Sequence, residues 1–283
     1  MTWIHIVVCV LVFAHAAGAQ TPWQPPRTPD GQPDMQGIWR HTESGADRAI
    51  LFLSIEGNIA GREVDFLGRD QFNGVVPPTR SFIVDPPDGK IPYHPWLLEK
   101  RQAFIANAFT PTELEHVDPV ARGWPGGVPR QIPGATQILQ GADSVVVLSE
   151  QNHTARLIRL DGSPHLGKAI TLMKGDSRGR WEGNTLVVDV TNQDKRTWLD
   201  FRSFQGDNLH VTERWTITGP DRIDYTATLT DPSVFTRPWT IAYPWIRDKT
   251  GYEVWEIPYV TAEGQRNVEQ ALRAGRKAKE EGR

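Results

Sequence analysis

Two charged residues occupy core-facing positions in two alternating segments. In residues 209–217 the odd positions are apolar except for Glu213, and in residues 235–243 they are apolar except for Arg237. Side chains along a β-strand alternate between its two faces, so both charges are expected to point toward the core. If the connecting loops are three residues long, Glu213, Ala227 and Arg237 form one cross-strand row. We therefore predict an inward carboxylate–guanidinium pair that meets over the small alanine.

The same alternation places aromatic side chains beside this pair. With the same loops, Trp215, Tyr225 and Trp239 form the next cross-strand row. Large flat side chains fill cores and also stack on sugar or aromatic ligands. An internal ion pair seldom adds net stability compared with apolar packing. Two interpretations stay open: a structural pair that fixes the register of the barrel, or a ligand-orienting or acid–base site in the barrel mouth.

Two histidines flank another alternating segment, residues 155–160, with His153 before it and His165 after it. A histidine beside an aspartate can act as a general base, while an arginine holds an anionic or carbonyl group. The alternative is structural, with the aspartates as turn formers and the second histidine as a loop anchor. The charged residues near the ends of this segment are Asp161, Asp176, Arg156, Arg178 and Arg180.

No pattern predicts a metal, a cofactor or a covalent nucleophile. Apart from His5 and His15, which lie in the N-terminal segment, the histidines show neither His-x-His nor His-x-x-x-His spacing. A Gly-x-Ser-x-Gly elbow and a Walker loop are absent, and residues 175–179 predict a hairpin turn. The single cysteine, Cys9, also lies in the N-terminal segment. We expect no metal site and no bound cofactor.

The second half of the chain alternates in short segments that turn clusters separate. Asp161-Gly162, Gly183-Asn184 and Gly219-Pro220-Asp221 are among these turns. Such spacing is typical of an antiparallel meander that closes into a barrel or a sandwich. We expect an all-β protein, an antiparallel β-barrel of lipocalin-like type with short peripheral helices. The alternating segments are residues 145–149, 155–160, 185–190, 209–217, 222–230, 235–243 and 252–259.

The remaining segments are expected to surround this barrel. Residues 1–19 are apolar and end in small residues, which predicts a cleaved signal peptide and a periplasmic or secreted protein. Residues 20–33 are rich in proline and predict an extended arm. Residues 34–262 then form a single barrel domain, and helical spacing predicts a helical insertion near residues 95–118. Residues 263–283 indicate a charged C-terminal helix.

Charge and length limit the classes of partner. The formal net charge is −3, with basic and acidic residues interleaved, which argues against a nucleic-acid partner because such binding needs a concentrated positive face. A membrane anchor is the alternative reading of residues 1–19. Their apolar run is shorter than the roughly 20 residues that span a bilayer, so no stable membrane insertion is expected after cleavage. The expected partner is a small molecule.

Three segments resemble a family of exported, largely uncharacterised bacterial proteins. They are Gly37-Ile38-Trp39, residues 160–165 (LDGSPH) and residues 175–188 (GDSRGRWEGNTLVV), and the last is the most specific. The resemblance, which runs from about residue 33 to residue 245, implies an extracytoplasmic β-barrel. Relatives often carry a Cys-His pair near the C-terminal strand, where this chain has Trp255-Glu256. The Gly-x-Trp is also similar to the opening of lipocalin-type barrels, in which the tryptophan plugs the closed end of a ligand-binding cup.

The leading hypothesis is an extracytoplasmic enzyme that acts on a small organic molecule by cofactor-independent acid–base chemistry, as a lyase, isomerase or hydrolase. The alternative is a binding protein for a hydrophobic or sugar-like ligand, without catalysis. The two hypotheses share one set of residues. The expected catalytic residues are Glu213, His153, His165 and Arg237, and the expected substrate-binding residues are Trp215, Tyr225, Trp239, Arg156 and Arg178.

Overall fold

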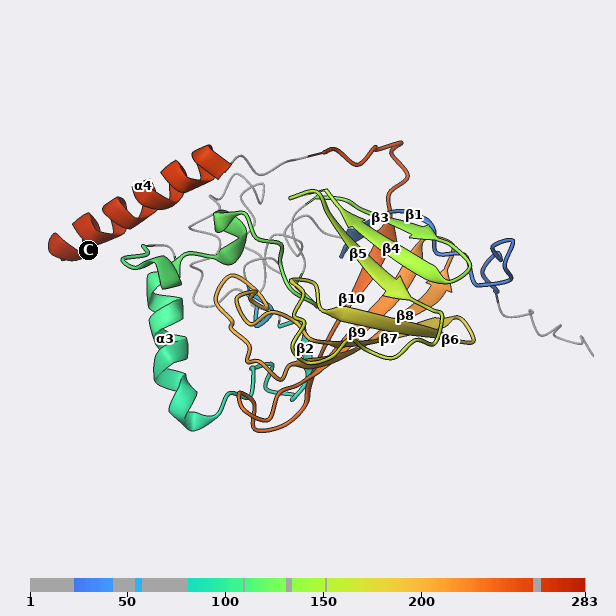
Figure 1. The fold of residues 1–283 in the computed structure, drawn as a ribbon, viewed down its shortest axis with the longest axis horizontal. Helices are drawn as coiled ribbons and strands as arrows, with labels where there is room; N and C mark the ends of the chain where they lie inside the picture. Colours follow the sequence, from blue (N-terminus) through green and yellow to red (C-terminus); the bar gives the residue numbers. More distant parts are fainter. Residues whose placement is uncertain are drawn as a thin grey trace, which may run out of the picture.

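The computed structural model describes residues 23–42, 54–57, 81–108, 110–130, 134–150, 152–256 and 261–282. Nine strands close into a mixed β-barrel because β10 pairs with β1 as well as with β9 (Figure 1). The short β2 adds to β10 outside this closed order. The all-β barrel expected from the alternating segments is confirmed. The strands are β1 (Gly37–His41), β2 (Ile83–Asp85), β3 (Thr136–Gln140), β4 (Ser144–Ser149), β5 (Thr154–Arg159), β6 (Asp176–Glu182), β7 (Thr185–Thr191), β8 (His210–Gly219), β9 (Arg222–Thr230) and β10 (Trp239–Arg247).

One pair of strands departs from the expected antiparallel order. β5 and β6 run parallel and are joined by two residue pairs alone, Ile158 with Ser177 and Arg159 with Arg178. Parallel neighbours require a long crossover, and residues 160–175 provide it. The prediction of a hairpin turn over residues 175–179 was wrong, because β6 begins at Asp176 and pairs with β7 along its whole length.

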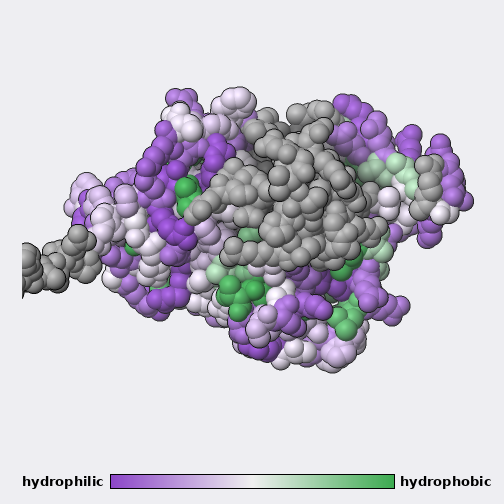
Figure 2. All heavy atoms as spheres, turned by 180° about the vertical axis from the view of Figure 1, so that it is seen from behind, coloured by the Kyte–Doolittle hydropathy of each residue, from purple (hydrophilic) through white to green (hydrophobic). Residues whose placement is uncertain are grey.

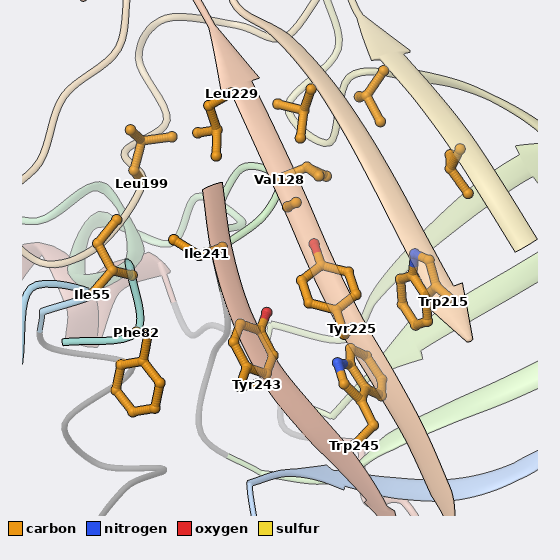
Figure 3. Packing of buried hydrophobic residues seen from close by; sticks show 14 of the residues in the cluster. Ile55, Phe82, Val128, Leu199, Trp215, Tyr225, Leu229, Ile241, Tyr243 and Trp245 are labelled. Carbon is orange, nitrogen blue, oxygen red and sulfur yellow. The ribbon is translucent and has the colours of Figure 1, made fainter. Parts of the chain in front are cut away.

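Alternation along the strands fills the barrel with aromatic and aliphatic side chains. On β8 and β9 the inward positions are all buried, whereas their neighbours in sequence are half-buried or exposed. Trp215, Tyr225, Tyr243 and Trp245 converge in the centre, where the rings of Trp215 and Trp245 lie 4.6 Å apart (Figure 3). These apolar side chains are the main stabilising component of the fold, since each contributes about 1.5–3 kcal/mol when buried.

The register of β8 and β9 follows the sequence prediction, but that of β10 does not. Glu213 faces Ala227, and Trp215 faces Tyr225, as expected. On the other side, Ala227 faces Ile241 instead of Arg237, because the connection between β9 and β10 runs through residues 231–238 and is longer than assumed. Arg237 therefore lies outside the strand. The slip is an even number of residues, so Trp239 still points inward and is fully buried.

Trp39 on β1 is packed in the core and bonded to the preceding arm. Trp39 is fully buried, donates from Nε1 to the carbonyl oxygen of Met35 at 3.0 Å and carries the Arg247 guanidinium 4.3 Å from its ring centre. Gly37 has a φ of +131°, and a Cβ there would overlap the guanidinium of Arg247. Within the described part of the arm, Gln32 bonds to the carbonyl oxygen of Ala142 at 2.7 Å. The arm is thus fastened along the turn between β3 and β4.

A buried loop, residues 126–130, which we call the capping loop, borders the interior void of the barrel. Its backbone is held at Val128, whose N–H donates to Oε1 of Gln193 at 2.7 Å. Arg130, at the end of the loop, forms a two-point buried ion pair with Asp118. These contacts hold the loop in place.

Helical segments lie on the side of the barrel opposite the N-terminal arm (Figure 1). They are η3 (Pro95–Leu97), α3 (Leu98–Asn107), η4 (Leu114–His116), η5 (Pro119–Arg122) and α4 (Thr261–Glu280). α4 packs on the segment before η4 through a bond from Arg276 to the carbonyl oxygen of Thr112 at 3.0 Å. Among the described helices, none is long and apolar enough to cross a bilayer. On the face turned away in Figure 1, hydrophobic residues form small separate patches on a hydrophilic described surface (Figure 2).

Candidate functional site

A polar cluster lies inside the apolar barrel around Glu213. Both carboxylate oxygens accept hydrogen bonds from the Arg156 guanidinium, one of them at 3.0 Å from Nη1. The hydroxyl of Tyr225 also donates to Glu213, at 2.7 Å. Burial and the adjacent carboxylate raise the pKa of Tyr225 well above its ordinary value, so its hydroxyl stays protonated as the donor. The carboxylate of Glu213 thus pairs with Arg156 and accepts hydrogen bonds on both oxygens.

Arg156 owes its position to the alternation of β5. Its neighbours Ala155 and Leu157 are exposed, whereas Arg156 and Ile158 point into the barrel. Nε of Arg156 donates to the hydroxyl of Ser177 at 3.0 Å, which leaves the two terminal nitrogens for Glu213. The partner of Glu213 is therefore Arg156, and the predicted pair of Glu213 with Arg237 was wrong.

The interior leaves little free volume. The void beside Glu213, Trp215 and Trp245 measures about 30 Å³, which is room for a water molecule or two rather than for an organic ligand. Trp215 and Tyr225 form a packed core row here, not the open wall of a cup. The void also borders Arg156 and Lys174.

A larger hollow opens on the outside of the barrel, where β5 and β6 separate. The two strands pair at residues 158–159 and 177–178, and the start of β5 then diverges from residues 172–175. Residues 172–175 turn toward the end of β7 instead, and the N–H of Leu172 donates to the carbonyl oxygen of Asn192 at 2.9 Å. The resulting groove has a volume of about 430 Å³, within the range of small-molecule sites.

Exposed leucines line this groove. The exposed fractions are 46% for Leu157, 39% for Leu166 and 40% for Leu172, and Met173 completes the apolar lining. Leu157 is exposed because it lies on the outer face of β5, next to the inward Arg156. Apolar side chains that gather on an open surface mark a binding site for an apolar partner. We call this hollow, with its leucines, Arg156, Lys174, Asp176 and Arg178, the β5–β6 groove.

Lys174 lies where the β5–β6 groove meets the interior void. Lys174 and Arg156 are the two residues that line both hollows. Among the described residues, the Lys174 ammonium has no hydrogen-bond or ion-pair partner. Burial and then the nearby positive charges of Arg156 and Arg130 together lower the pKa of Lys174 to about 7, against the opposing effect of Glu213.

Arg178 and Asp176 form the far wall of the groove. Asp176 accepts from Arg178 at 2.5 Å, from Nδ1 of His165 at 3.0 Å and from the N–H of Leu166 at 2.8 Å. The bonds from Leu166, His165 and Arg178 and the charge of Arg178 outweigh burial and lower the pKa of Asp176. Arg178 also donates to the carbonyl oxygen of Pro164. These contacts hold the loop after β5 in place, so His165 serves as an anchor on the rim.

The four residues expected to be catalytic do not meet. His153 and His165 lie beyond opposite ends of β5, which has six residues, a length of about 17–20 Å. His153 is exposed, and its Nε2 lies 4.0 Å from Glu256. Arg237 is exposed and pairs with Asp85 on β2 at 2.5 Å. Glu213 is in the core. Of the expected substrate-binding residues, Arg156 and Arg178 line the β5–β6 groove.

A second open hollow, of about 520 Å³, lies among the helical segments. Trp124 lies there between the guanidinium groups of Arg122 and Arg196, at 4.9 and 4.8 Å from the ring centre. This hollow shares no lining residue with the interior void. We therefore take the β5–β6 groove as the candidate site, since it alone of these two reaches the buried ion pair.

Sequence reasoning missed Lys174 and the leucines of the groove. Lys174 and Leu172 fall between alternating segments, where no periodicity assigns a face. The sequence did contain one indication of the groove. The stretch from residue 160 to residue 175 is too long for a hairpin loop and lacks the alternation of a strand, which indicates a crossover connection. Within the described ranges, no three His, Cys, Asp or Glu side chains are arranged to hold a metal ion.

Models of known protein families and curated protein sequences were both compared with this chain, and neither comparison gives a match. The resemblance carried by residues 37–39, 160–165 and 175–188 therefore stays a prediction.

Proposed function

We propose that the protein binds a small amphipathic molecule in the β5–β6 groove. The apolar body of the ligand lies on Leu157, Leu166 and Leu172, and its oxygen-bearing end, a carboxylate or a carbonyl, faces Lys174. The observation that carries this proposal is an ammonium group that has no partner among the described residues and lies at the floor of a groove with apolar walls. This is the binding alternative of the sequence analysis, with a different set of residues.

The apolar walls supply the binding free energy. Covering the leucines removes apolar surface from water, at about 25 cal/mol for each Å². An alkyl chain meets these leucines without any need to open the packed barrel. A ligand inside the barrel is disfavoured, because the void there has about 30 Å³.

Lys174, at the floor of the groove, determines which polar group of a ligand can bind there. An ammonium carries three donors and no acceptor, so it pairs with an anion or a carbonyl oxygen. Asp176 is already engaged by Arg178, and Glu213 by Arg156, so neither carboxylate neutralises Lys174. An anionic end therefore restores the charge balance that Lys174 lacks.

The leading hypothesis of an acid–base enzyme receives less support from this geometry. It required Glu213, His153, His165 and Arg237 around one reacting molecule, and these side chains lie at separate places. Export to the periplasm or beyond stays part of the proposal, on the basis of residues 1–19 alone.

Titration calorimetry with decanoate tests the binding proposal. We expect decanoate to bind to the intact protein and Leu157→Ser to weaken the affinity by about fivefold or more through lost apolar contact. Leu139→Ser is the matched control, because Leu139 on β3 is 44% exposed and lies outside the groove. Equal affinities for the two variants, or no binding of decanoate at all, would contradict the proposal.

The pH dependence of decanoate binding tests the polar end. Because the pKa of Lys174 is about 7, the ammonium loses its proton above that pH, and the affinity for the anion should then fall. Decanol, which carries no charge, should bind with an affinity that does not change over the same range. Lys174→Met should remove the pH dependence for decanoate. A pH-dependent affinity that persists in Lys174→Met would exclude Lys174 as the anion-binding group.

A further inference from the structure

We propose that Lys174 is a nucleophilic amine that forms an imine with an aldehyde or ketone held in the β5–β6 groove. This inference rests on the proposed function, because the carbonyl compound takes the place of the amphipathic ligand. It adds a covalent step, and it narrows the oxygen-bearing end of the ligand to a carbonyl group.

The surroundings of Lys174 disfavour its ammonium form. Arg156 and Arg130, on β5 and on the capping loop, are the cations that face it, and each pairs with a carboxylate of its own, Glu213 and Asp118. Among the described carboxylates, Glu213 is the one whose charge acts on Lys174 in the opposite direction. A lysine that is desolvated beside other cations exists partly as the free amine, which is how proteins activate lysine as a nucleophile.

The lowered pKa determines what fraction of Lys174 side chains is unprotonated. The pKa of Lys174 is lowered to about 7, so about half of the side chains carry a free amine at neutral pH, against fewer than about one in a thousand for an ordinary lysine. The geometry allows the amine to act, since Lys174 lines the open groove as well as the void. A buried amine without an entrance would have no access to a carbonyl compound.

The reaction needs no oxidant, reductant or cofactor. The lone pair of Nζ attacks the carbonyl carbon, the C=O π electrons move to oxygen, and the nitrogen loses a proton to water while the oxygen gains one. The carbinolamine hydroxyl then takes up a proton from water and leaves as water while the nitrogen lone pair forms the C=N bond, and the nitrogen releases its remaining proton to water to give the neutral imine. Water in the groove and in the adjoining void can carry these protons. Glu213 is not the proton acceptor, because Arg156 and Tyr225 already occupy its oxygens.

Reductive trapping tests the inference on the intact protein. Decanal and sodium cyanoborohydride at pH 7 convert an imine into a stable secondary amine, which peptide mass spectrometry then locates. Lys168 is an internal comparison, because it lies in the same connection and is exposed. We expect Lys174 to be modified at least about tenfold faster than Lys168, since its amine is far more often unprotonated at this pH. Similar rates at the two lysines would overturn the inference.

Variants separate the covalent step from the charge. Lys174→Arg keeps the positive charge and removes the amine, so it should lose decanal trapping and still bind decanoate. Lys168→Arg is the matched control and should leave trapping at Lys174 unchanged. The comparison of Lys174 with Lys168 in the unaltered chain needs no variant, so it decides the question even if Lys174→Arg fails to fold.

The two proposals fail in different ways. If decanoate binds but decanal does not react selectively at Lys174, the groove binds ligands and the imine is excluded. If neither ten-carbon compound associates but propanal still reacts selectively at Lys174, the amine is nucleophilic and the binding proposal is wrong.

Discussion

Arg156 on β5 reaches across the barrel to Glu213 on β8, although two strands of the wall, β6 and β7, lie between them in the sheet. The pair is almost fully buried, and Tyr225 and Ser177 complete its hydrogen bonds. Two charges held in this way are costly to bury but far more costly to separate. The pair therefore links β5 to β8 across the barrel interior.

Removal of one member of this pair should destabilise the protein strongly. Glu213→Gln leaves the Arg156 guanidinium buried without a counter-charge, and we expect a loss of about 3–5 kcal/mol in the free energy of unfolding, measured with urea. Glu182→Gln is the control, because Glu182 pairs with Arg180 and Arg214 on the exposed surface, and it should cost less than about 1 kcal/mol. Equal losses for the two variants would show that the buried pair contributes no more to the free energy of unfolding than an exposed pair.

Lys174 should make the stability depend on pH near neutrality. Its pKa in the folded chain is about 7, below the ordinary lysine value, so the unfolded chain binds more protons at alkaline pH and stability rises with pH above about 7. Below about pH 7 Lys174 is protonated in the folded chain, and the buried ammonium then destabilises the fold to its full extent. Lys174→Met should therefore raise the urea midpoint most at pH 6 and progressively less from pH 7 to pH 9. A gain that is constant with pH would contradict the lowered pKa.

Asp248 should contribute to stability at neutral pH and lose that contribution in acid. Hydrogen bonds from Thr250, and then from Arg40, lower the pKa of Asp248 to about 2. Because the folded pKa lies below the unfolded value, the contribution is complete above about pH 4 and disappears as the pH falls toward 2. Asp248→Asn should thus destabilise the protein at pH 6 and have a smaller effect near pH 2. Asp30→Asn, at an exposed turn, should change stability little at either pH.

Gly37 should tolerate no larger residue. Gly37→Ala adds a methyl group that would lie 2.3 Å from Nη1 of Arg247, at a φ of +131°. Gly183→Ala is the matched control, since Gly183 also has a positive φ, +61°, but has open space around its Cα. Thermal unfolding should show a loss of about 1 kcal/mol for the control, from its backbone conformation alone, and a clearly larger loss for Gly37→Ala. A smaller loss at Gly37 would mean that Arg247 moves away at no cost.

The sequence by itself determined the inward faces of β8 and β9. Alternation is a local property of the extended chain, so Glu213, Trp215 and Tyr225 could be assigned to the core, and the pairing of β8 with β9 followed from a short turn. The register of β10 differs from the predicted register by an even number of residues, so alternation still points Trp239 inward, although Arg237 lies outside the strand.

The tertiary structure alone decided the partner of Glu213 and the place of the groove. Arg156 meets Glu213 because the sheet closes, and closure depends on the order and length of all the strands at once. Lys174 lies at the floor of the groove, without a partner in the described part of the chain, because the parallel β5 and β6 pair over two residue pairs and then separate. Local periodicity carries no information about contacts across a barrel, since these are set by strand order, register and the course of the crossover.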